Sequence, residues 1–163
     1  MIVGFVGRIG WEKGLLYLIE AMKQVKATLV LVGPYKDVAG DNTYKTLKNV
    51  ELKGPISHDK LRNFYKSIDC LVLPSTNNLE TFGIVQAEAM VCGTPVVATN
   101  LPGVRVPIQM TGMGEVCKIA DSQDLADKIN IVLKNGKKYY RNRAKNLDKF
   151  DYLKTVDEYE KLF

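Results

Sequence analysis

Histidine is almost absent from this chain, since His58 is the only one among 163 residues. A Ser-His-Asp triad needs a histidine as its general base, and a histidine-based metal site needs several. The sequence also lacks an Asp-x-Asp pair that would hold a divalent cation. We therefore expect neither a catalytic triad nor a metal site, and we expect His58 to lie exposed near a helix start.

Two glycine-rich nucleotide-binding motifs are missing as well. The first apolar run ends in "GFVGRIG", which is not Gly-x-Gly-x-x-Gly, and no Walker lysine loop occurs. The first motif is the fingerprint of dinucleotide binding, and the second is that of phosphate-loop hydrolases. Dinucleotide oxidoreduction and phosphate-loop hydrolysis are both disfavoured.

Cysteines and long apolar runs are also scarce. Cys70, Cys92 and Cys117 are odd in number, scattered and surrounded by apolar residues, so we expect buried thiols in a reducing compartment. No apolar run reaches the ~18–20 residues of a membrane span. The first ten residues, "MIVGFVGRIG", lack a basic start and are interrupted by Arg8, so we interpret them as a strand and not as a signal peptide. A cytoplasmic protein is expected.

The positive charge is concentrated in one stretch. Residues 134–149 hold seven Lys or Arg against one Asp, or +6, so the rest of a chain of net charge +5 sits near −1. Such a stretch is either a solvated helix face or a peripheral anchor on an anionic membrane surface. Tyr139 and Tyr140 are adjacent and not spaced for base stacking, so no nucleic-acid partner is expected.

Short apolar runs alternate with helical patterns along the whole chain, which is typical of a doubly wound parallel sheet of the α/β, Rossmann-like class. One domain accounts for residues 1–163, with no repeat and no linker. After the last strand, two further helices are expected at about 137–149 and 152–162. The predicted strands are 2–7, 27–33, 50–54, 70–74, 94–99 and 114–120.

Helix boundary signals lie between these strands. Ser57 is expected to cap the helix that carries Leu61 and Phe64. Asp121 or Ser122 is expected to cap the helix after the last strand, and Gly136 suits its C-terminal end.

Ligands of doubly wound sheets collect at the carboxyl ends of the strands, where two cations follow the first strand. Arg8 leaves the end of that strand, and Lys13 comes at the start of the next helix. Two cations at such a rim suit a phosphate group, Arg through forked hydrogen bonds and Lys as a point charge. The alternative is a pair of surface cations.

The segment "ETFGIVQAE", residues 80–88, follows the fourth predicted strand and holds two carboxylates. Gly83 allows close approach to a helix start whose free N–H groups attract anions. Glu80 must then face something other than phosphate, and sugar hydroxyls suit a carboxylate. Glu88 lies roughly 7.5 Å along the helix axis from Gly83, at 1.5 Å per residue, about the step from a diphosphate to its ribose. Alternatively, Glu88 pairs with a buried lysine or caps a loop amide.

Four segments in this order carry a family resemblance: "FVGRIGWEKG", "CLVLPS", "ETFGIVQAEAMVCGTPVVAT" and "LPGV". Together they resemble the C-terminal, donor-binding domain of retaining glycosyltransferases of the GT-B architecture, in the group-1 set (family 4) with its Glu-x7-Glu motif. The resemblance runs from residue 2 to about residue 163. The "LPGV" loop is of the type that borders a pocket.

The resemblance implies a role for each matching residue. Arg8 and Lys13 would bind the donor diphosphate, and Glu80 would contact the transferred sugar. Glu88 would hold the ribose. The distal phosphate would lie on the backbone of Thr81, Phe82, Gly83 and Ile84, and the base would lie against Gly54, Pro55 and Ile56.

The function implied is hexosyl transfer, with retention, from a nucleotide-diphosphate sugar to an acceptor hydroxyl, without a metal or other cofactor. The donor would be a UDP-, GDP- or ADP-sugar. The family's N-terminal domain, which supplies most of the acceptor site, is expected to be missing, so that the chain alone would be inactive. Two other functions remain open: a non-catalytic nucleotide-sugar-binding module, and a sugar-nucleotide epimerase of the same architecture.

Overall fold

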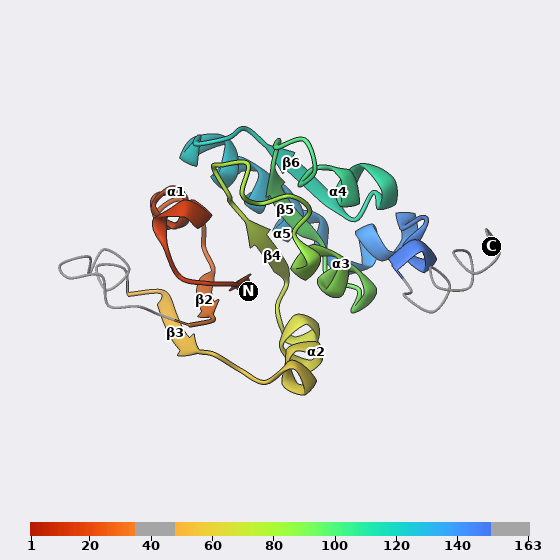
Figure 1. Cartoon of the computed structure of the whole chain (residues 1–163), viewed down its shortest axis with the longest axis horizontal. Coiled ribbons are helices and arrows are strands. Elements are labelled where there is room, and N and C mark those ends of the chain that lie inside the picture. The colour runs from red at the N-terminus through yellow and green to blue at the C-terminus, as the bar shows by residue number, and fades with distance from the viewer. Residues whose placement is uncertain (35–47, 151–163) are drawn as a thin grey trace.

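The computed structural model describes residues 1–34 and 48–150, which form one six-stranded parallel sheet in the order β3-β2-β1-β4-β5-β6 (Figure 1). The predicted doubly wound sheet is therefore confirmed. The strands are β1 (Ile2–Val6), β2 (Thr28–Val32), β3 (Val50–Gly54), β4 (Cys70–Leu73), β5 (Val96–Thr99) and β6 (Gly114–Cys117).

Burial explains which runs became central strands. All four residues of β4 and of β5 are buried, as is the middle of β1, whereas β3 lies at the sheet edge with three exposed residues. Continuous apolar runs of this kind mark strands covered on both faces. Each strand lies within its predicted range; the last ends at Cys117, three residues early, because the chain turns through Ala120 at φ 56°.

Helices cover both faces of the sheet. The helices are α1 (Leu15–Met22), α2 (His58–Ser67), α3 (Ile84–Val91), α4 (Val106–Thr111) and α5 (Ser122–Arg143), with short 3-10 turns η1 (Trp11–Lys13) and η3 (Leu147–Phe150). Right-handed crossovers place α1 on one face, where it packs against α5. The same rule places α2 and α3, which contact each other, on the opposite face.

The sheet order changes direction between β1 and β4, which are neighbours although the chain visits β2 and β3 between them. The loops that leave these two strands diverge, and a crevice opens at the carboxyl ends of the sheet. Gly14, at φ 71°, keeps the two loops close together, because a Cβ at this position would overlap the carbonyl oxygen of Pro74.

The helix signals in the sequence were partly right. Asp121 caps α5 by accepting a hydrogen bond from the Asp124 amide, 2.9 Å away. Ser57 is the N-cap residue of α2 but makes no side-chain cap bond. Gly136 breaks α5 at φ 74°, as expected. The helix predicted at about 137–149 ends early, at Arg143, because the chain leaves the helical conformation at Ala144, with ψ 132°. The predicted helix at 152–162 lies outside the described residues.

Helix α4 was not predicted. It follows the "LPGV" loop after β5, and no element was assigned to the residues that form it. Pro107 sits in its first turn, where a missing backbone N–H costs nothing, and Gly112 ends it at φ 68°. The helix is six residues long, too short to leave a periodic apolar pattern.

The cysteines and the basic stretch are also placed. Cys70 and Cys117 are buried, whereas Cys92 is partly exposed, and all three are free thiols. Two cations of the basic stretch serve the fold: Lys137 Nζ donates to the Lys66 carbonyl oxygen and Arg141 Nε to that of Gly93, both at 2.9 Å. Within residues 1–34 and 48–150, no helix has the length and apolarity needed to cross a bilayer.

Gly14 and Gly112 provide a matched test of the contact between the two loops. Both have left-handed backbones, but a Cβ on Gly112 would meet only ordinary van der Waals neighbours. We expect Gly112→Ala to lower the free energy of unfolding by about 1–2 kcal/mol, the cost of a left-handed residue with a side chain. Gly14→Ala should cost clearly more because of its overlap with Pro74. Urea denaturation measures both; equal losses would show that Gly14 is needed only for its backbone conformation.

Candidate functional site

A pocket of ≈ 520 Å³ lies at the carboxyl ends of β1 and β4, and we call it the switch-point pocket. It brings together most of the predicted site: Arg8, Lys13 and Glu80 line it together with residues 81–84. These residues come from two loops about 70 positions apart in the chain, which the strand order makes neighbours. Its lining is Val6, Gly7, Arg8, Lys13, Leu73, Glu80, Thr81, Phe82, Gly83, Ile84 and Val85.

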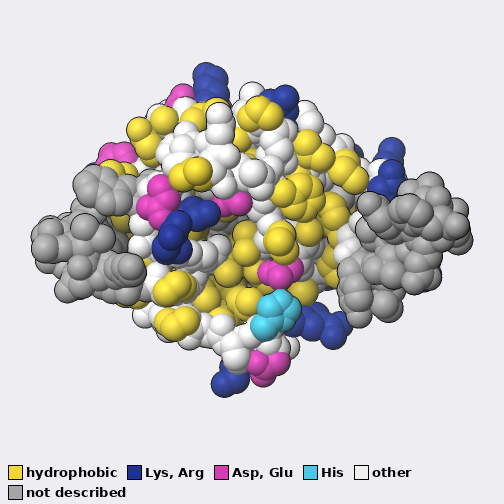
Figure 2. Space-filling model, viewed as in Figure 1, with side chains coloured by type: hydrophobic (Ala, Val, Ile, Leu, Met, Phe, Trp, Pro, Cys, Tyr) yellow, Lys and Arg dark blue, Asp and Glu magenta, His cyan; other side chains and the backbone are white. Residues whose placement is uncertain are grey.

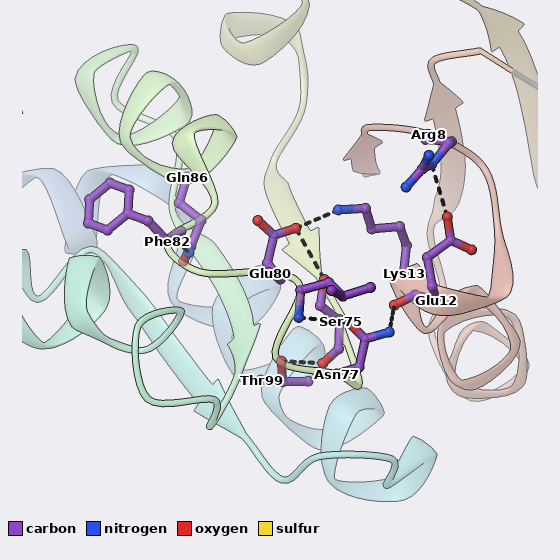
Figure 3. A network of polar contacts seen from close by, with 10 residues as sticks. Arg8, Glu12, Lys13, Ser75, Asn77, Glu80, Phe82, Gln86 and Thr99 are labelled. Carbon is purple, nitrogen blue, oxygen red and sulfur yellow. Dashed lines mark hydrogen bonds and ion pairs between the residues drawn. The ribbon is translucent and has the colours of Figure 1, made fainter.

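An ion pair connects the two sides of the switch-point pocket. Lys13 Nζ lies 2.7 Å from Glu80 Oε2, and both side chains are mostly buried (Figure 3). The hydroxyl of the buried Ser75 lies 3.4 Å from the same carboxylate oxygen. Oε1 of Glu80 has no partner among the described residues. Glu80 is therefore held through one oxygen and presents the other.

Arg8 also has a carboxylate partner. Its Nε lies 2.9 Å from Glu12 Oε1, and its side chain is 64% exposed, so the guanidinium is at the rim of the pocket (Figure 3). The two cations of the site, Arg8 and Lys13, are thus balanced by the two acids Glu12 and Glu80. An anionic ligand would enter a site without net charge, by replacing carboxylates as the partners of these cations.

The segment 80–83 leads into α3, which begins at Ile84 after Gly83 at φ 73°. The first backbone N–H groups of a helix have no partner within the helix and carry its positive dipole end. Gly83, Ile84 and Val85 line the switch-point pocket, so the start of α3 borders it. The predicted helix start thus lies beside the two cations, and anion binding there stays a prediction.

Gln86 holds the loop before this helix start through hydrogen bonds outside the pocket lining. Its side chain is fully buried, and Nε2 donates to the carbonyl oxygens of Phe82 at 2.8 Å and Val104 at 3.0 Å. Its Oε1 is buried without a hydrogen-bond partner in the described structure. An unpaired buried acceptor costs about 1–3 kcal/mol. Gln86 was not predicted, because a lone glutamine in an apolar helix carries no pattern.

Glu88 lies in a second pocket, of ≈ 480 Å³, which we call the α2–α3 pocket. The two pockets share Ile84. The second is lined by His58, Asp59, Leu61, Arg62, Tyr65, Lys66, Ile84, Ala87, Glu88, Val91, Cys92 and Phe150. The segment "ETFGIVQAE" thus places its first acid in one pocket and its second acid in the adjoining one.

The partner of Glu88 is a phenol, and neither a buried lysine nor a loop amide. The Tyr65 hydroxyl donates to Glu88 Oε2 at 2.6 Å, and His58 Nε2 lies 3.4 Å from Oε1. Burial, together with the adjacent Glu88 carboxylate, raises the pKa of Tyr65 well above its ordinary value, so the phenol stays neutral. The Glu88 side chain remains 28% exposed. The sequence indicated Tyr65 only as an inward-facing helix residue.

His58 is at the start of α2 with its side chain 88% exposed, as predicted, and Figure 2 shows this single histidine at the surface beside an acidic side chain. Pro55 and Ile56, the predicted base contacts, line neither of the two pockets; Pro55 is exposed and Ile56 packs against the core. In the described part of the chain, no three His, Cys, Asp or Glu side chains come together as a metal site would require.

Comparison with known proteins places the chain. The sequence profile of the family described as "Glycosyl transferases group 1" matches residues 1–150. The D-inositol 3-phosphate glycosyltransferase of Mycolicibacterium smegmatis is 33% identical over 167 residues, which cover 96% of this chain and 38% of the relative. The chain therefore spans well under half the length of that relative.

Solved structures share the fold. HepE of Anabaena, in complex with UDP, superposes with a TM-score of 0.77 at 23% identity, over 99% of this chain and 49% of HepE. The C-terminal domain of the group 1 glycosyl transferase LpcC from Francisella tularensis gives 0.74 at 24% identity, over 94% of this chain and 85% of that domain. The sheet is thus that of a GT-B C-terminal domain.

The family profile extends over all but the last 13 residues of the 163 (163 − 150 = 13), and it includes both loops of the switch-point pocket. The chain belongs to the group 1 glycosyl transferases.

Proposed function

We propose that this chain is the donor-binding half of a retaining glycosyltransferase, which moves a hexose from a nucleotide-diphosphate sugar to an acceptor hydroxyl. The observation that carries the proposal is the switch-point pocket, where Arg8, Lys13, Glu80 and the start of α3 meet. Cations, helix amides and a carboxylate at one place suit a diphosphate joined to a sugar. HepE, which has the same fold, was solved with UDP and with UDP-glucose, which supports this class of ligand.

In the proposed reaction, the negative charge that builds up on the departing diphosphate is stabilised by Arg8, Lys13 and the first amides of α3. These groups already line the pocket, and the cations would exchange their carboxylate partners when the donor binds, so little reorganisation is left for the reaction itself. No metal is required in this scheme. Burial of Lys13, whose side chain is only 22% exposed, strengthens its interaction with a phosphate.

The transferred sugar would contact Glu80 through Oε1, the oxygen without a partner among the described residues. Ser75 and Lys13 hold the other oxygen in the ligand-free chain, and Ser75 would remain its partner once a phosphate has taken the lysine. Glu80 then orients the hexose so that the acceptor attacks from the side of the leaving group, which retains the anomeric configuration. Glu80 is not a covalent nucleophile in this scheme.

The nucleoside would occupy the α2–α3 pocket, with its ribose hydroxyls on Glu88. The carboxylate is held by Tyr65 and partly exposed to the pocket. The base would extend from this pocket past His58 toward the loop at Gly54, Pro55 and Ile56, which lies outside the pocket lining. The acceptor site and full activity would require a second domain, consistent with the 49% of HepE that this chain covers.

Replacing Glu80 by Gln separates its two proposed roles. The variant releases Lys13 from its ion pair and adds one positive charge to the pocket, so a nucleoside diphosphate should bind several-fold more tightly, about 0.5–1 kcal/mol. Transfer from the intact donor sugar should fall, because a carboxylate for the sugar hydroxyls is lost. Calorimetry of this chain with UDP, GDP and ADP measures binding, and product formation by the two-domain enzyme measures transfer.

Lys13→Ala is the control. It should lower the affinity for the nucleoside diphosphate by about ten-fold or more, because a charged hydrogen bond is lost. Weaker diphosphate binding by Glu80→Gln would contradict the competition between the carboxylate and the phosphate. No binding of any of the three nucleotides to the unaltered chain would contradict the proposed function itself.

Cys92 reports on the α2–α3 pocket. It lies one helical turn after Glu88 on the same wall, partly exposed, while Cys70 and Cys117 are buried. A nucleoside in this pocket should slow the alkylation of Cys92 by iodoacetamide, which peptide mass spectrometry follows. Burial raises the pKa of Cys92, so the reaction should be run at mildly alkaline pH, where more thiolate is present. Glu88→Gln should abolish the protection; an unchanged rate with the nucleotide at saturation would place the nucleoside elsewhere.

The basic stretch leads to a separate proposal, a peripheral contact with an anionic membrane surface. Lys134, Lys138, Lys145 and Lys149 are exposed. We expect binding to vesicles with acidic lipids that fades as salt rises, because exposed charges are screened within about 10 Å at 0.1 M salt. Sedimentation with neutral vesicles is the control, and equal binding to both would exclude an electrostatic contact.

A further inference from the structure

The side chain of Gln86 joins two loops that lie far apart in the sequence. Its amide group donates to the carbonyl oxygen of Phe82, in the loop before α3, and to that of Val104, in the loop after β5. Figure 3 shows Gln86 and Phe82 together at one side of the polar network that contains Glu80 and Lys13. Both bonds come from one nitrogen, so the positions of the two carbonyl groups are coupled.

A second contact fixes the same two loops. A Cβ on Gly103 would overlap the carbonyl oxygen of Thr81, so the backbones touch at this point. The ring of Phe82 also meets Phe150 edge-on, with centroids 6.3 Å apart. Residues 81–82 are therefore held against residues 103–104 by backbone contact and by the Gln86 amide.

The direction of the Phe82 carbonyl determines how the backbone enters α3 at the edge of the pocket. With this carbonyl bound to Gln86, the chain passes through Gly83 in the left-handed region and enters α3 at Ile84. The first turn of α3 then borders the switch-point pocket, which Gly83, Ile84 and Val85 line, and the free N–H groups of a helix lie in this turn. Gln86 itself does not line the pocket, so it does not touch a ligand there.

Gln86 has opposing effects on stability. Its Nε2 satisfies two carbonyl oxygens, whereas its Oε1 is buried without a partner in the described structure, a cost that an apolar side chain of the same length would avoid. What the glutamine adds is a defined position for two carbonyl groups at the mouth of the proposed phosphate site.

We propose that Gln86 is a positioning residue, which sets the amides at the start of α3 for the terminal phosphate of the donor's diphosphate. The inference rests on the proposed function, because it assumes that a diphosphate binds there. In this proposal Gln86 affects the binding of the terminal phosphate only. The first phosphate and the nucleoside would be held by groups that Gln86 does not contact.

This assignment is tested by comparing a nucleoside diphosphate with the matching monophosphate. Gln86→Met keeps the length of the side chain and removes both hydrogen bonds. We expect the affinity for UDP to fall about ten-fold, as when one or two charged hydrogen bonds are misplaced, while the affinity for UMP stays unchanged. The ratio of the two dissociation constants, from calorimetry on the whole chain, is the quantity to measure, with GDP and ADP pairs if UDP does not bind.

Two further variants make the result decisive. Thr111→Val removes another buried hydrogen bond, from Oγ1 to the Pro107 carbonyl oxygen in α4, and should leave the UDP/UMP ratio unchanged. Gly103→Ala pushes apart the same two loops from the opposite side and should lower UDP affinity selectively, so it carries the test if Gln86→Met does not fold.

Equal weakening of UDP and UMP by Gln86→Met would overturn the inference in favour of a purely structural role. An unchanged ratio with unchanged affinities would overturn it too. If the unaltered chain binds none of the diphosphates, the proposed function fails, and the inference fails with it. If the unaltered chain binds UDP and Gln86→Met binds UDP and UMP as well as the unaltered chain does, only the role of Gln86 is refuted and the proposed function stands.

Discussion

The reversal of strand order between β1 and β4 is the constraint on which the site depends. Neighbouring parallel strands whose connections run in opposite directions leave a crevice at their carboxyl ends. In this chain the crevice is kept narrow by backbone contact, since Gly14 lies directly against Pro74. The close approach lets Lys13 reach Glu80 across the boundary. The strand order thus provides the crevice, and its width is set by Gly14, because this residue has no side chain.

Charge balance within that opening is a consequence of the same approach. Arg8 and Lys13 would repel each other in an empty pocket, and each is instead matched by a carboxylate, Glu12 and Glu80. Partly buried cations without partners would carry a desolvation cost. The pairs make the empty site stable, and a diphosphate exchanges for them. The free energy of diphosphate binding is therefore the attraction to the two cations less the energy of the two ion pairs that are lost. Because the carboxylates compete for the cations, release of the diphosphate product is favoured once the sugar has left.

The sequence predicted the sheet, and which residues gather at its switch point, because both depend on local patterns. Buried parallel strands are continuous apolar runs, and the residues after them must gather at one edge. Contacts between distant helices leave no such pattern: Tyr65 reaches Glu88 only because α2 packs on α3, and Gln86 reaches Val104 only because two loops meet. Helix α4 was missed because a short helix after Pro-Gly reads as a loop. Pro55 and Ile56 came from resemblance alone and do not line either pocket.

The two acids of "ETFGIVQAE" are in different electrostatic states, and this has a consequence for how a donor would bind. Glu88 is held through Oε2 by a neutral phenol and has no lysine or arginine partner among the described residues, so it can accept from hydroxyl groups at once. Glu80 is neutralised by Lys13 and becomes fully available only when a phosphate takes the lysine. A nucleoside can therefore be bound without breaking the pairs of Arg8 and Lys13, whereas the diphosphate must displace them. In the proposed function, the sugar meets a carboxylate that is freed by the same ligand's own phosphate, which couples recognition of the two ends of the donor.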